Sequence, residues 1–427
     1  MFFYLSFLRP PPTQAPLSSP ILITPQISND LRTEPFLSVQ DLYYSWLQEP
    51  EPRTARNVAP KGPVFTQPTK LTTYRQATAY KEIPVPLPKN LREGQQWRLI
   101  LMVQNRMDTL SIDLGKEDIG AGTTFPVLSM PILFTARAGR WAPKQEQIER
   151  LYRFSVTRPE LPSAPDGGQS SPSTAGPSVQ NVALRIREQT SFDLDKKIWD
   201  SGIGLSSWLV KLAESSSTGG FQLGQEGSAL RERLKEIILN TSRQRILELG
   251  NVLPSTPFPY NMITRFKGAG IGIVALVLSV LRANFRATES AEERDEILTT
   301  DLDSAIPLLE HNIATNQRFY PSVELKAGVL NWEEDYISQV KESGPKFDLV
   351  VMADVTYNTS SFPALVQTLK SILQANEEKK PLIVLGYKQR DESERSLWEM
   401  AKEIGIDFVP VGEVPGYGEA PIEIWIA

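Results

Sequence analysis

The sequence predicts an α/β fold, in which a mostly parallel sheet carries helices on both faces, preceded by an N-terminal extension with some β structure. From residue 182 onward, short apolar segments alternate with segments of helical spacing. Such alternation is typical of parallel strands joined by crossover helices. Residues 61–157 have mostly strand-like character instead. The two patterns divide the chain into an extension and a C-terminal α/β domain.

Length and composition exclude several classes of protein. The chain has 427 residues, which suggests two or three globular units, and hydrophobic residues make up 41% of it, so a sizeable core can form. The net charge of -5 argues against a general polyanion binder, so we expect no nucleic-acid partner. The lack of cysteine excludes disulfides and thiol catalysis, and the single histidine, His311, excludes a poly-histidine metal site. We expect no bound metal.

The N-terminal extension spans residues 1–157 and begins with a proline-rich part that looks extended. Its first apolar run, residues 1–8, is shorter than the roughly 20 residues of a membrane-spanning helix. The run has no basic start or small-residue cleavage site, which favours a strand over a targeting signal. We therefore expect a cytoplasmic or nuclear protein with no membrane segment. Further along, residues 97–103 and 127–134 predict strands and residues 145–154 predict a short helix.

Residues 158–181 predict a linker. They are dense in proline, serine and glycine, and such a segment cannot bury enough apolar surface to order itself.

The C-terminal domain, residues 182–427, follows the linker. Apolar runs that end in glycine or an acid predict strands, and apolar residues spaced three and four apart predict helices. In chain order, the predicted strands are residues 182–187, 245–250, 297–301, 347–354, 382–387, 407–411 and 423–426. The predicted helices are residues 205–213, 270–283, 304–316, 362–375 and 393–404.

Three predicted strands end in residues suited to chemistry: Glu248 with Gly250, then Asp301, then Asp354. We expect them along one edge of the sheet, because ligands of such sheets bind beyond the carboxyl ends of the strands. A glycine turn after the first strand lets backbone approach a ligand closely. An acid after the second strand suits a ribose diol, since a carboxylate accepts from both hydroxyls. Together they predict a nucleoside-containing cofactor.

Trp332 would follow a third strand, where its ring could stack on adenine. Simpler interpretations remain open for these residues. Asp301 could be a solvated acid, Trp332 a core aromatic, Asp354 a helix cap and Tyr357 a packing residue.

Five motifs occur in a fixed order along the C-terminal domain. They are Ile198-Trp-Asp-Ser-Gly202, Ile246-Leu-Glu-Leu-Gly250, Leu298-Thr-Thr-Asp301 with Leu309-Glu-His-Asn312, Leu330-Asn-Trp332, and Ala353-Asp-Val-Thr-Tyr357. In this order they resemble the seven-β-strand protein-lysine methyltransferases, also called methyltransferase family 16, over residues 182–427. The last motif matches the family's Asp-x-x-Tyr signature. The N-terminal extension resembles no family that we can name.

The resemblance implies a Rossmann-like seven-stranded sheet, S-adenosylmethionine as cofactor and the lysine side chain of a protein as substrate. It implies that Asp354 and Tyr357 face the target amine. It implies that the cofactor is held by Trp199, Glu248, Gly250, Gly270, Gly272, Asp301 and Trp332.

The implied reaction makes physical sense for these side chains. A neutral amine becomes cationic as it takes the methyl group from a sulfonium. A carboxylate such as Asp354 can accept from the amine and stabilise the developing charge. An aromatic ring such as Tyr357 adds a cation–π surface worth about 0.5–2 kcal/mol. Neither a metal nor a covalent intermediate is needed.

The glycine motif of the family is interrupted in this chain. Removing residues 251–268 would join Ile246-Leu-Glu-Leu-Gly250 to Ala269-Gly-Ile-Gly272 and restore it. We interpret these residues as translated intron, the alternative being a genuine loop insertion. Closing a longer loop costs only about 0.6 kcal/mol per doubling of its length, so the sheet can still form. We expect S-adenosylmethionine binding to suffer, because the glycine turn is no longer pre-organised.

Three other functions remain open at the level of sequence. Gly270-Ile-Gly-Ile-Val-Ala275 fits the glycine pattern of a nicotinamide-dependent oxidoreductase, although the preceding residues make a poor strand. A non-enzymatic binding protein could keep the methyltransferase fold and lack the cofactor. A methyltransferase could also act on a small amine rather than on a protein.

Overall fold

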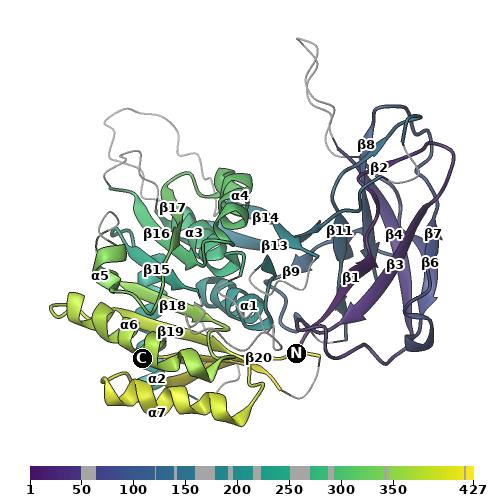
Figure 1. Cartoon of the computed structure of the whole chain (residues 1–427). Coiled ribbons are helices and arrows are strands. Elements are labelled where there is room, and N and C mark those ends of the chain that lie inside the picture. The colour runs from purple at the N-terminus through teal and green to yellow at the C-terminus, as the bar shows by residue number, and fades with distance from the viewer. Residues whose placement is uncertain are drawn as a thin grey trace, which may run out of the picture.

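The computed structural model describes residues 1–49, 64–120, 122–138, 142–158, 178–190, 196–214, 223–250, 270–286, 293–340, 344, 346–417 and 420–427. A β-rich N-terminal region and an α/β C-terminal region lie side by side, joined through the long strands β13 and β14 (Figure 1). Within the described residues, no helix is both long and apolar enough to cross a membrane.

Two sheets build the β-rich region. The smaller sheet has the order β10 (Thr124–Phe125), β1 (Phe3–Arg9), β3 (Ile21–Ser28) and β7 (Ile83–Val85). The main path of the larger sheet runs through β14 (Ser178–Gln189), β13 (Gln147–Arg158), β11 (Val127–Ser129), β8 (Gln96–Met102), β12 (Ile132–Phe134) and β2 (Gln14–Ala15). Off this path lie β4 (Gln40–Gln48), β5 (Val64–Phe65), β6 (Thr69–Tyr74) and β9 (Ile112–Asp113). The predicted N-terminal strand is confirmed as β1.

The helix predicted at residues 145–154 is wrong, because this segment forms strand β13. Its apolar residues are spaced partly as in a helix, but Tyr152, Phe154 and Val156 are buried at every second position, as in a strand. Strand β13 pairs along its full length with β14. The tertiary pairing therefore overrides the weak helical pattern.

Strand β14 also changes the predicted boundary between linker and C-terminal domain. Residues 182–187 were expected to begin the α/β sheet, but they lie in β14, which belongs to the larger sheet of the β-rich region. Arg158 and residues 178–181 of the predicted linker are strand residues. Residues 159–177 lie outside the described residues.

Two smaller differences between the predicted and the observed elements have local causes. Residues 127–134 form two strands, β11 and β12, separated by Met130 and Pro131. Proline has no N–H for the ladder, so the chain changes partner there. The helix α2 (Gln225–Leu239) was not predicted, because a Ser/Gly-rich stretch before it suggested a loop.

The C-terminal region contains a seven-stranded sheet. Its order is β17 (Val323–Val329), β16 (Asp295–Asp301), β15 (Arg245–Leu249), β18 (Leu349–Ala353), β19 (Leu382–Tyr387), β21 (Ile422–Ile426) and β20 (Val409–Val414). The first five strands pair in parallel, and β21 is antiparallel to both of its neighbours. The predicted alternation of strands and helices is confirmed.

Helices cover both faces of this sheet, because residues of each inner strand alternate between two cores. In β18, Leu349 and Val351 pack on one face, and Val350 and Met352 on the other. The first face is covered by α1 (Asp200–Glu214), α2, α3 (Ile273–Phe285) and α4 (Ile306–Asn316). The second face is covered by α5 (Tyr336–Gln339), α6 (Phe362–Ala375) and α7 (Ser396–Glu403).

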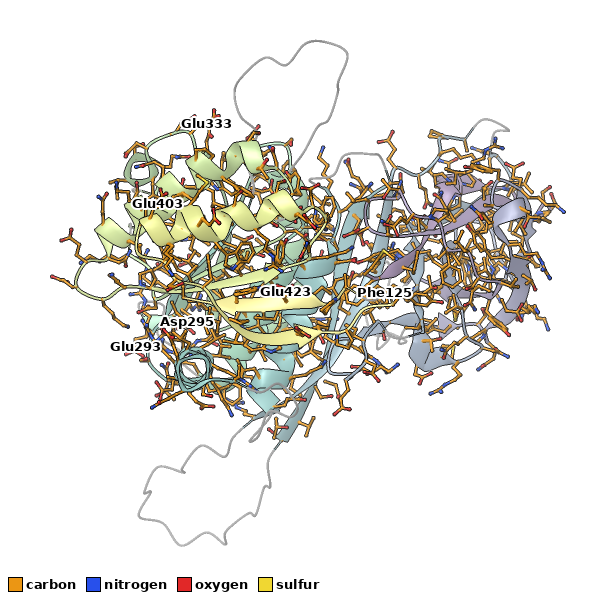
Figure 2. All side chains as sticks on the ribbon, turned by 90° about the horizontal axis from the view of Figure 1, so that it is seen from below. Phe125, Glu293, Asp295, Glu333, Glu403 and Glu423 are labelled. Atoms are coloured by element: carbon orange, nitrogen blue, oxygen red, sulfur yellow. The ribbon has the colours of Figure 1, made fainter. Side chains whose placement is uncertain are left out.

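The two regions share one core and a polar junction. Phe125 of the β-rich region lies in the same apolar cluster as Ile422 and Ile424, on the side that faces the C-terminal strands (Figure 2). At the junction, Asn316 of α4 accepts from the backbone N–H of Arg185 at 2.9 Å and donates to its carbonyl at 2.9 Å. The outer edge of β14 is thus paired by side chains of a helix.

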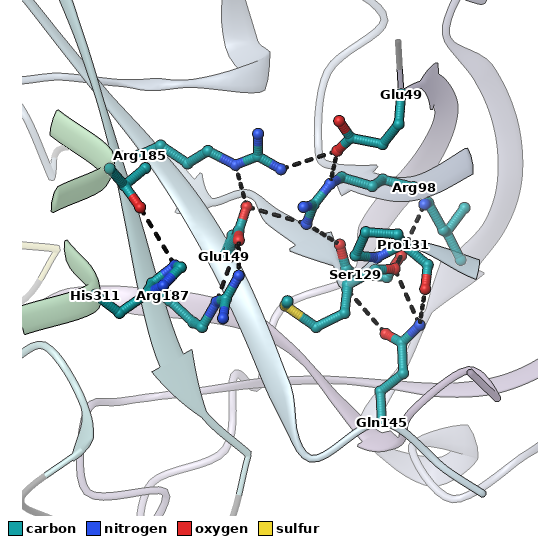
Figure 3. Close-up of polar contacts among 12 residues, drawn as sticks. Glu49, Arg98, Ser129, Pro131, Gln145, Glu149, Arg185, Arg187 and His311 are labelled. Atoms are coloured by element: carbon teal, nitrogen blue, oxygen red, sulfur yellow. Dashed lines mark hydrogen bonds and ion pairs between the residues drawn. The ribbon is translucent and has the colours of Figure 1, made fainter. Parts of the chain in front are cut away.

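A buried ion-pair network lies behind this junction. The Glu149 carboxylate of β13 is surrounded by Arg98, Arg185 and Arg187, and Glu49 contacts two of these arginines (Figure 3). Each buried charge therefore has a partner, as burial of charge requires.

Candidate functional site

The parallel strands bring the predicted site residues to one edge of the sheet. Asp301 is the last residue of β16, Gly250 follows β15 and Asp354 follows β18. In the sheet, β15 lies between β16 and β18, with Thr299 beside Glu248 and Leu249 beside Met352. The two acids therefore lie at the same carboxyl edge, separated by one strand.

Glu248 is buried under this edge. Its carboxylate accepts from the Thr299 hydroxyl at 2.7 Å, and the Thr300 hydroxyl donates to its carbonyl at 2.9 Å. Thr300 also accepts from the N–H of Gly250 at 3.3 Å, so β16 fixes the end of β15. Burial raises the pKa of Glu248 to about 7, although the hydrogen bond from Thr299 partly offsets it.

The described part of the glycine turn is built around Gly270 and Gly272, both at positive φ (72° and 76°). A Cβ on Gly270 would lie 2.4 Å from the carbonyl oxygen of Lys197, so this position requires glycine. The N–H of Gly270 donates to the Asp301 carboxylate at 3.1 Å. That carboxylate also accepts from the N–H of Leu302 at 2.6 Å and is fully buried. The interpretation of Asp301 as a solvated acid is therefore wrong.

Trp332 lies on the other face of the sheet edge. It is 2% exposed and packs in the apolar cluster with Tyr336, Phe362 and Leu365. Its indole N–H has no acceptor among the described residues. It is thus a core aromatic with one unsatisfied donor at the edge where the cofactor was predicted.

Asp354 adopts a left-handed backbone conformation (φ 56°) directly after β18. One carboxylate oxygen accepts from the N–H of Ser201, in the first turn of α1, at 2.8 Å. The other oxygen is in close contact with the Arg390 guanidinium. Such a strained conformation in a non-glycine residue is typical of functional positions.

Two aromatic rings, those of Tyr357 and Trp199, lie between Asp354 and the glycine turn. Tyr357 stacks on Trp199, with ring centroids 6.3 Å apart and planes 9° apart. The Trp199 ring lies 3.5 Å from the Cβ position of Gly270. The Arg390 guanidinium lies over Trp199, 5.5 Å from the ring centroid. Trp199 therefore connects the glycine turn to the pair Asp354 and Tyr357.

Four charged residues that were not predicted form an ion-pair network that reaches Asp354 through Arg390. Asp200 accepts from the N–H of Phe2 at 2.9 Å, from the Tyr4 hydroxyl at 2.6 Å and from Lys388 at 2.7 Å. Lys388 lies 3.4 Å from Asp30, which contacts Arg390 at 2.9 Å. The missed residues are Asp30, Asp200, Lys388 and Arg390.

Lys388 and Arg390 could have been found from the sequence, because they directly follow β19, the strand next to β18. Asp200 is part of the motif that includes Trp199. Asp30 gives no such signal, since it reaches the site only through the packing of the β-rich region.

The residues at this edge fit an adenosyl cofactor in their chemistry. Buried carboxylates stand where two strands end, and two glycines at positive φ form the described part of the turn beside them. The unsatisfied indole N–H of Trp332 offers a donor nearby. Residues 251–268, the segment that interrupts the predicted motif, lie outside the described residues.

Comparison with known proteins agrees with the sequence resemblance. The chain is 28% identical over 140 residues to the protein-lysine N-methyltransferase EFM6 of Saccharomyces cerevisiae, which covers 32% of this chain and 53% of that protein. It is 25% identical over 142 residues to the calmodulin-lysine N-methyltransferase of Arabidopsis thaliana, covering 33% and 42%. The matches thus span about half of each relative or less.

Solved structures are also similar to the chain. A methyltransferase from Pyrococcus furiosus is 13% identical, covers 49% of this chain and 87% of its own, and has a TM-score of 0.27. An O-methyltransferase from Bacillus cereus in complex with SAH is 15% identical, covers 54% and 91%, and has a TM-score of 0.28.

The region that contains the glycine turn, Asp301, Trp332, Asp354 and Arg390 matches a family as a whole. Residues 266–404 match the sequence model of the lysine methyltransferase family.

Proposed function

We propose that the protein is an S-adenosylmethionine-dependent N-methyltransferase that modifies a lysine side chain of another protein. The observation that carries this proposal is the row of Glu248, Asp301 and Asp354 at the carboxyl ends of neighbouring strands, of which Asp301 and Asp354 lie in the region that matches the lysine methyltransferase family. We further propose that the sheet is the Rossmann-like sheet of that family, and that the protein acts in the cytoplasm or nucleus.

The cofactor supplies an electrophilic methyl group on a sulfonium. In the proposal, Asp301 accepts from the ribose hydroxyls, because a carboxylate at the end of this strand can accept from both hydroxyls of the diol. Glu248 and the glycines Gly250, Gly270 and Gly272 hold the methionine part. Trp332 lies by the adenine and Trp199 lines the pocket.

Asp354 and Tyr357 act on the target amine. Asp354 accepts from the amine and stabilises the positive charge that develops on nitrogen. Tyr357, backed by the stacked ring of Trp199, presents an aromatic face to that cation. A protein substrate is supported by the names of three relatives, which are lysine methyltransferases of proteins.

A first experiment tests the cofactor site. Asp301→Asn should weaken binding of S-adenosylmethionine at least about tenfold in titration calorimetry, because a charged acceptor of two hydroxyls is lost. Asp303→Asn, the same change at an exposed position two residues later, serves as the matched control and should bind like the unaltered chain. Equal affinities of the two variants would reject the assignment of Asp301.

A second experiment tests the interrupted motif. The chain lacking residues 251–268 should bind S-adenosylmethionine more tightly than the full chain, since the deletion restores the short glycine turn. Both forms are then given labelled S-adenosylmethionine and a cell protein extract, and label on lysine is measured. Equal affinities would show that the segment does not disturb the turn.

The same calorimetry and labelling distinguish a methyltransferase from the main alternative, a binding protein that keeps the fold but does not bind the cofactor. The contacts that Asp301 and Asp354 already make favour this alternative. Asp301 accepts from the backbone N–H groups of Gly270 and Leu302. Asp354 accepts from the N–H of Ser201 and contacts Arg390. No calorimetric binding and no label transfer by either form would establish it. The match to the lysine methyltransferase family argues against the nicotinamide alternative.

A further inference from the structure

Arg390 joins two carboxylates that come from opposite ends of the chain. One guanidinium nitrogen binds Asp30 at 2.9 Å, and the other is in close contact with Asp354. The side chains of Asp30 and Asp354 are 0% and 2% exposed, so solvent does not screen either contact. Asp30 belongs to the β-rich region, whereas Arg390 and Asp354 belong to the region that matches the lysine methyltransferase family.

These two contacts determine where the guanidinium lies. The Nε of Arg390 is buried and has no acceptor among the described residues. The ring of Trp199 supports the guanidinium plane but does not fix its rotation. Because a guanidinium is a rigid planar fork, holding one nitrogen at Asp30 sets the position of the nitrogen that meets Asp354.

Asp30 is itself held in place. Its carboxylate accepts from the N–H of Leu31 at 2.9 Å and of Asp200 at 3.4 Å, and Lys388 lies at 3.4 Å. Burial would raise the pKa of Asp30, but Arg390 and Lys388 outweigh it and lower the pKa to about 2. Asp30 is therefore an ionised and fixed anchor at neutral pH.

We propose that Asp30 of the β-rich region is a positioning residue for Asp354 and acts through Arg390. This inference rests on the proposed function, because Asp354 matters only if it meets the substrate amine. Arg390 and Ser201 each use one oxygen of Asp354 and fix its plane, and the remaining lone pairs are left for the amine. The β-rich region is then part of the catalytic unit.

The test measures the rate of methyl transfer from labelled S-adenosylmethionine to a cell protein extract, at saturating cofactor and at a temperature where each variant is folded. It is made with the full chain and with the form lacking residues 251–268. Asp30→Asn keeps the size of the side chain but removes its charge. It should lower the rate about tenfold or more, because small misplacements of a reacting group cost that much. The affinity for S-adenosylmethionine should stay within about twofold, as expected for a residue that acts on Asp354 alone.

Asn316→Ala is the matched control. It removes buried hydrogen bonds between the same two regions, at the junction of α4 with β14. It should lower the melting temperature without changing the rate of the folded protein. If Asp30→Asn also changes only the melting temperature, or if it weakens cofactor binding as much as it lowers the rate, the inference is overturned.

A second variant covers the case in which Asp30→Asn does not fold. Arg390→Lys keeps the positive charge but cannot bridge two carboxylates as a fork does. It should also lower the rate at unchanged cofactor affinity, and a normal rate would overturn the inference. If neither unaltered form transfers label, the proposed function fails, and the inference fails with it. Transfer by an unaltered form with no loss in either variant rejects the inference alone.

Discussion

At the scale of single residues, the site depends on acids that the fold removes from water. Glu248 is 1% exposed, and its carboxylate accepts a hydrogen bond from the neutral hydroxyl of Thr299. Desolvation without a cationic partner disfavours the charged form, which is why the pKa rises to about 7. Asp30 is equally buried, but its pKa falls because two cations contact it. Two buried acids of one site thus differ in charge at neutral pH.

The raised pKa of Glu248 predicts a specific dependence of stability on pH. An unfolded glutamic acid loses its proton near pH 4.3, whereas the folded chain holds it until about pH 7. Between these values the folded state binds more protons, so the free energy of unfolding falls as pH rises. Glu248→Gln removes the ionisable group. Its stability relative to the unaltered chain should therefore increase by about 2 kcal/mol from pH 5 to pH 8.

Urea unfolding at the two pH values measures this difference. The control is Glu236→Gln, the same change at an exposed position of α2, which should follow the pH dependence of the unaltered chain. A Glu248→Gln variant with that same pH dependence would mean that the carboxyl is ionised throughout.

The sequence could reveal the residues at strand ends but not those that reach the site from elsewhere. Asp301 and Asp354 were predicted together because apolar strands precede both, and parallel strands end at one edge. Lys388 and Arg390 obey the same rule, since they lie one and three residues past β19, but they were not predicted. No local pattern marks Asp30, since its role depends on how two regions of the chain pack.

At the scale of elements, the glycine turn shows how backbone conformation limits substitution. Gly270 and Gly94 both have positive φ, at 72° and 83°. An added Cβ at Gly94 meets nothing within 4 Å, whereas at Gly270 it meets the backbone oxygen of Lys197 at 2.4 Å. A side chain at either position would therefore meet the conformational penalty of positive φ. At Gly270 its Cβ would also clash with the backbone of Lys197.

This difference gives a paired prediction. Gly94→Ala should cost about 1 kcal/mol of unfolding free energy, the usual penalty of a side chain in the left-handed region. Gly270→Ala should cost at least about 2 kcal/mol more, because a backbone oxygen must move and the hydrogen bond to Asp301 is strained with it. Denaturant unfolding of both variants checks this, and equal costs would show that the turn yields without strain.

Element prediction succeeded where a pattern was long and failed where pairing decided the outcome. Most strands and helices from residue 245 onward were found because each has a clear apolar run or helical spacing, whereas no range was predicted for β17 or for the short helix α5. Strand β13 was predicted as a helix because its apolar residues fit both periods, and only its pairing with β14 selects the strand. Residues 182–187 pair with β13 in this hairpin and therefore do not belong to the C-terminal sheet in which they were predicted.

At the scale of the whole molecule, each region has a core of its own, and one large apolar cluster is built from residues of both. Phe2, just before β1, and Tyr4 of β1 share a cluster with Leu205 of α1. Tyr152 and Leu184 of the hairpin belong to the same cluster. A hydrogen bond from Tyr4 to Asp200 and an ion pair between Asp30 and Arg390 cross the same boundary. A boundary drawn at residue 182 would thus cut through a packed interior.

The shared core predicts that the regions stay together when the covalent link between β13 and β14 is cut. A protease site placed within residues 159–177 would allow cleavage of the folded protein. The two fragments should co-elute in gel filtration, because the β13–β14 pairing and the common cluster remain intact. Calorimetry should show a single melting transition, since neither part alone buries the apolar surface of the shared cluster. Separate elution or two independent transitions would mean that each region is a domain in its own right, and Asp30 could then leave Arg390 without unfolding the chain.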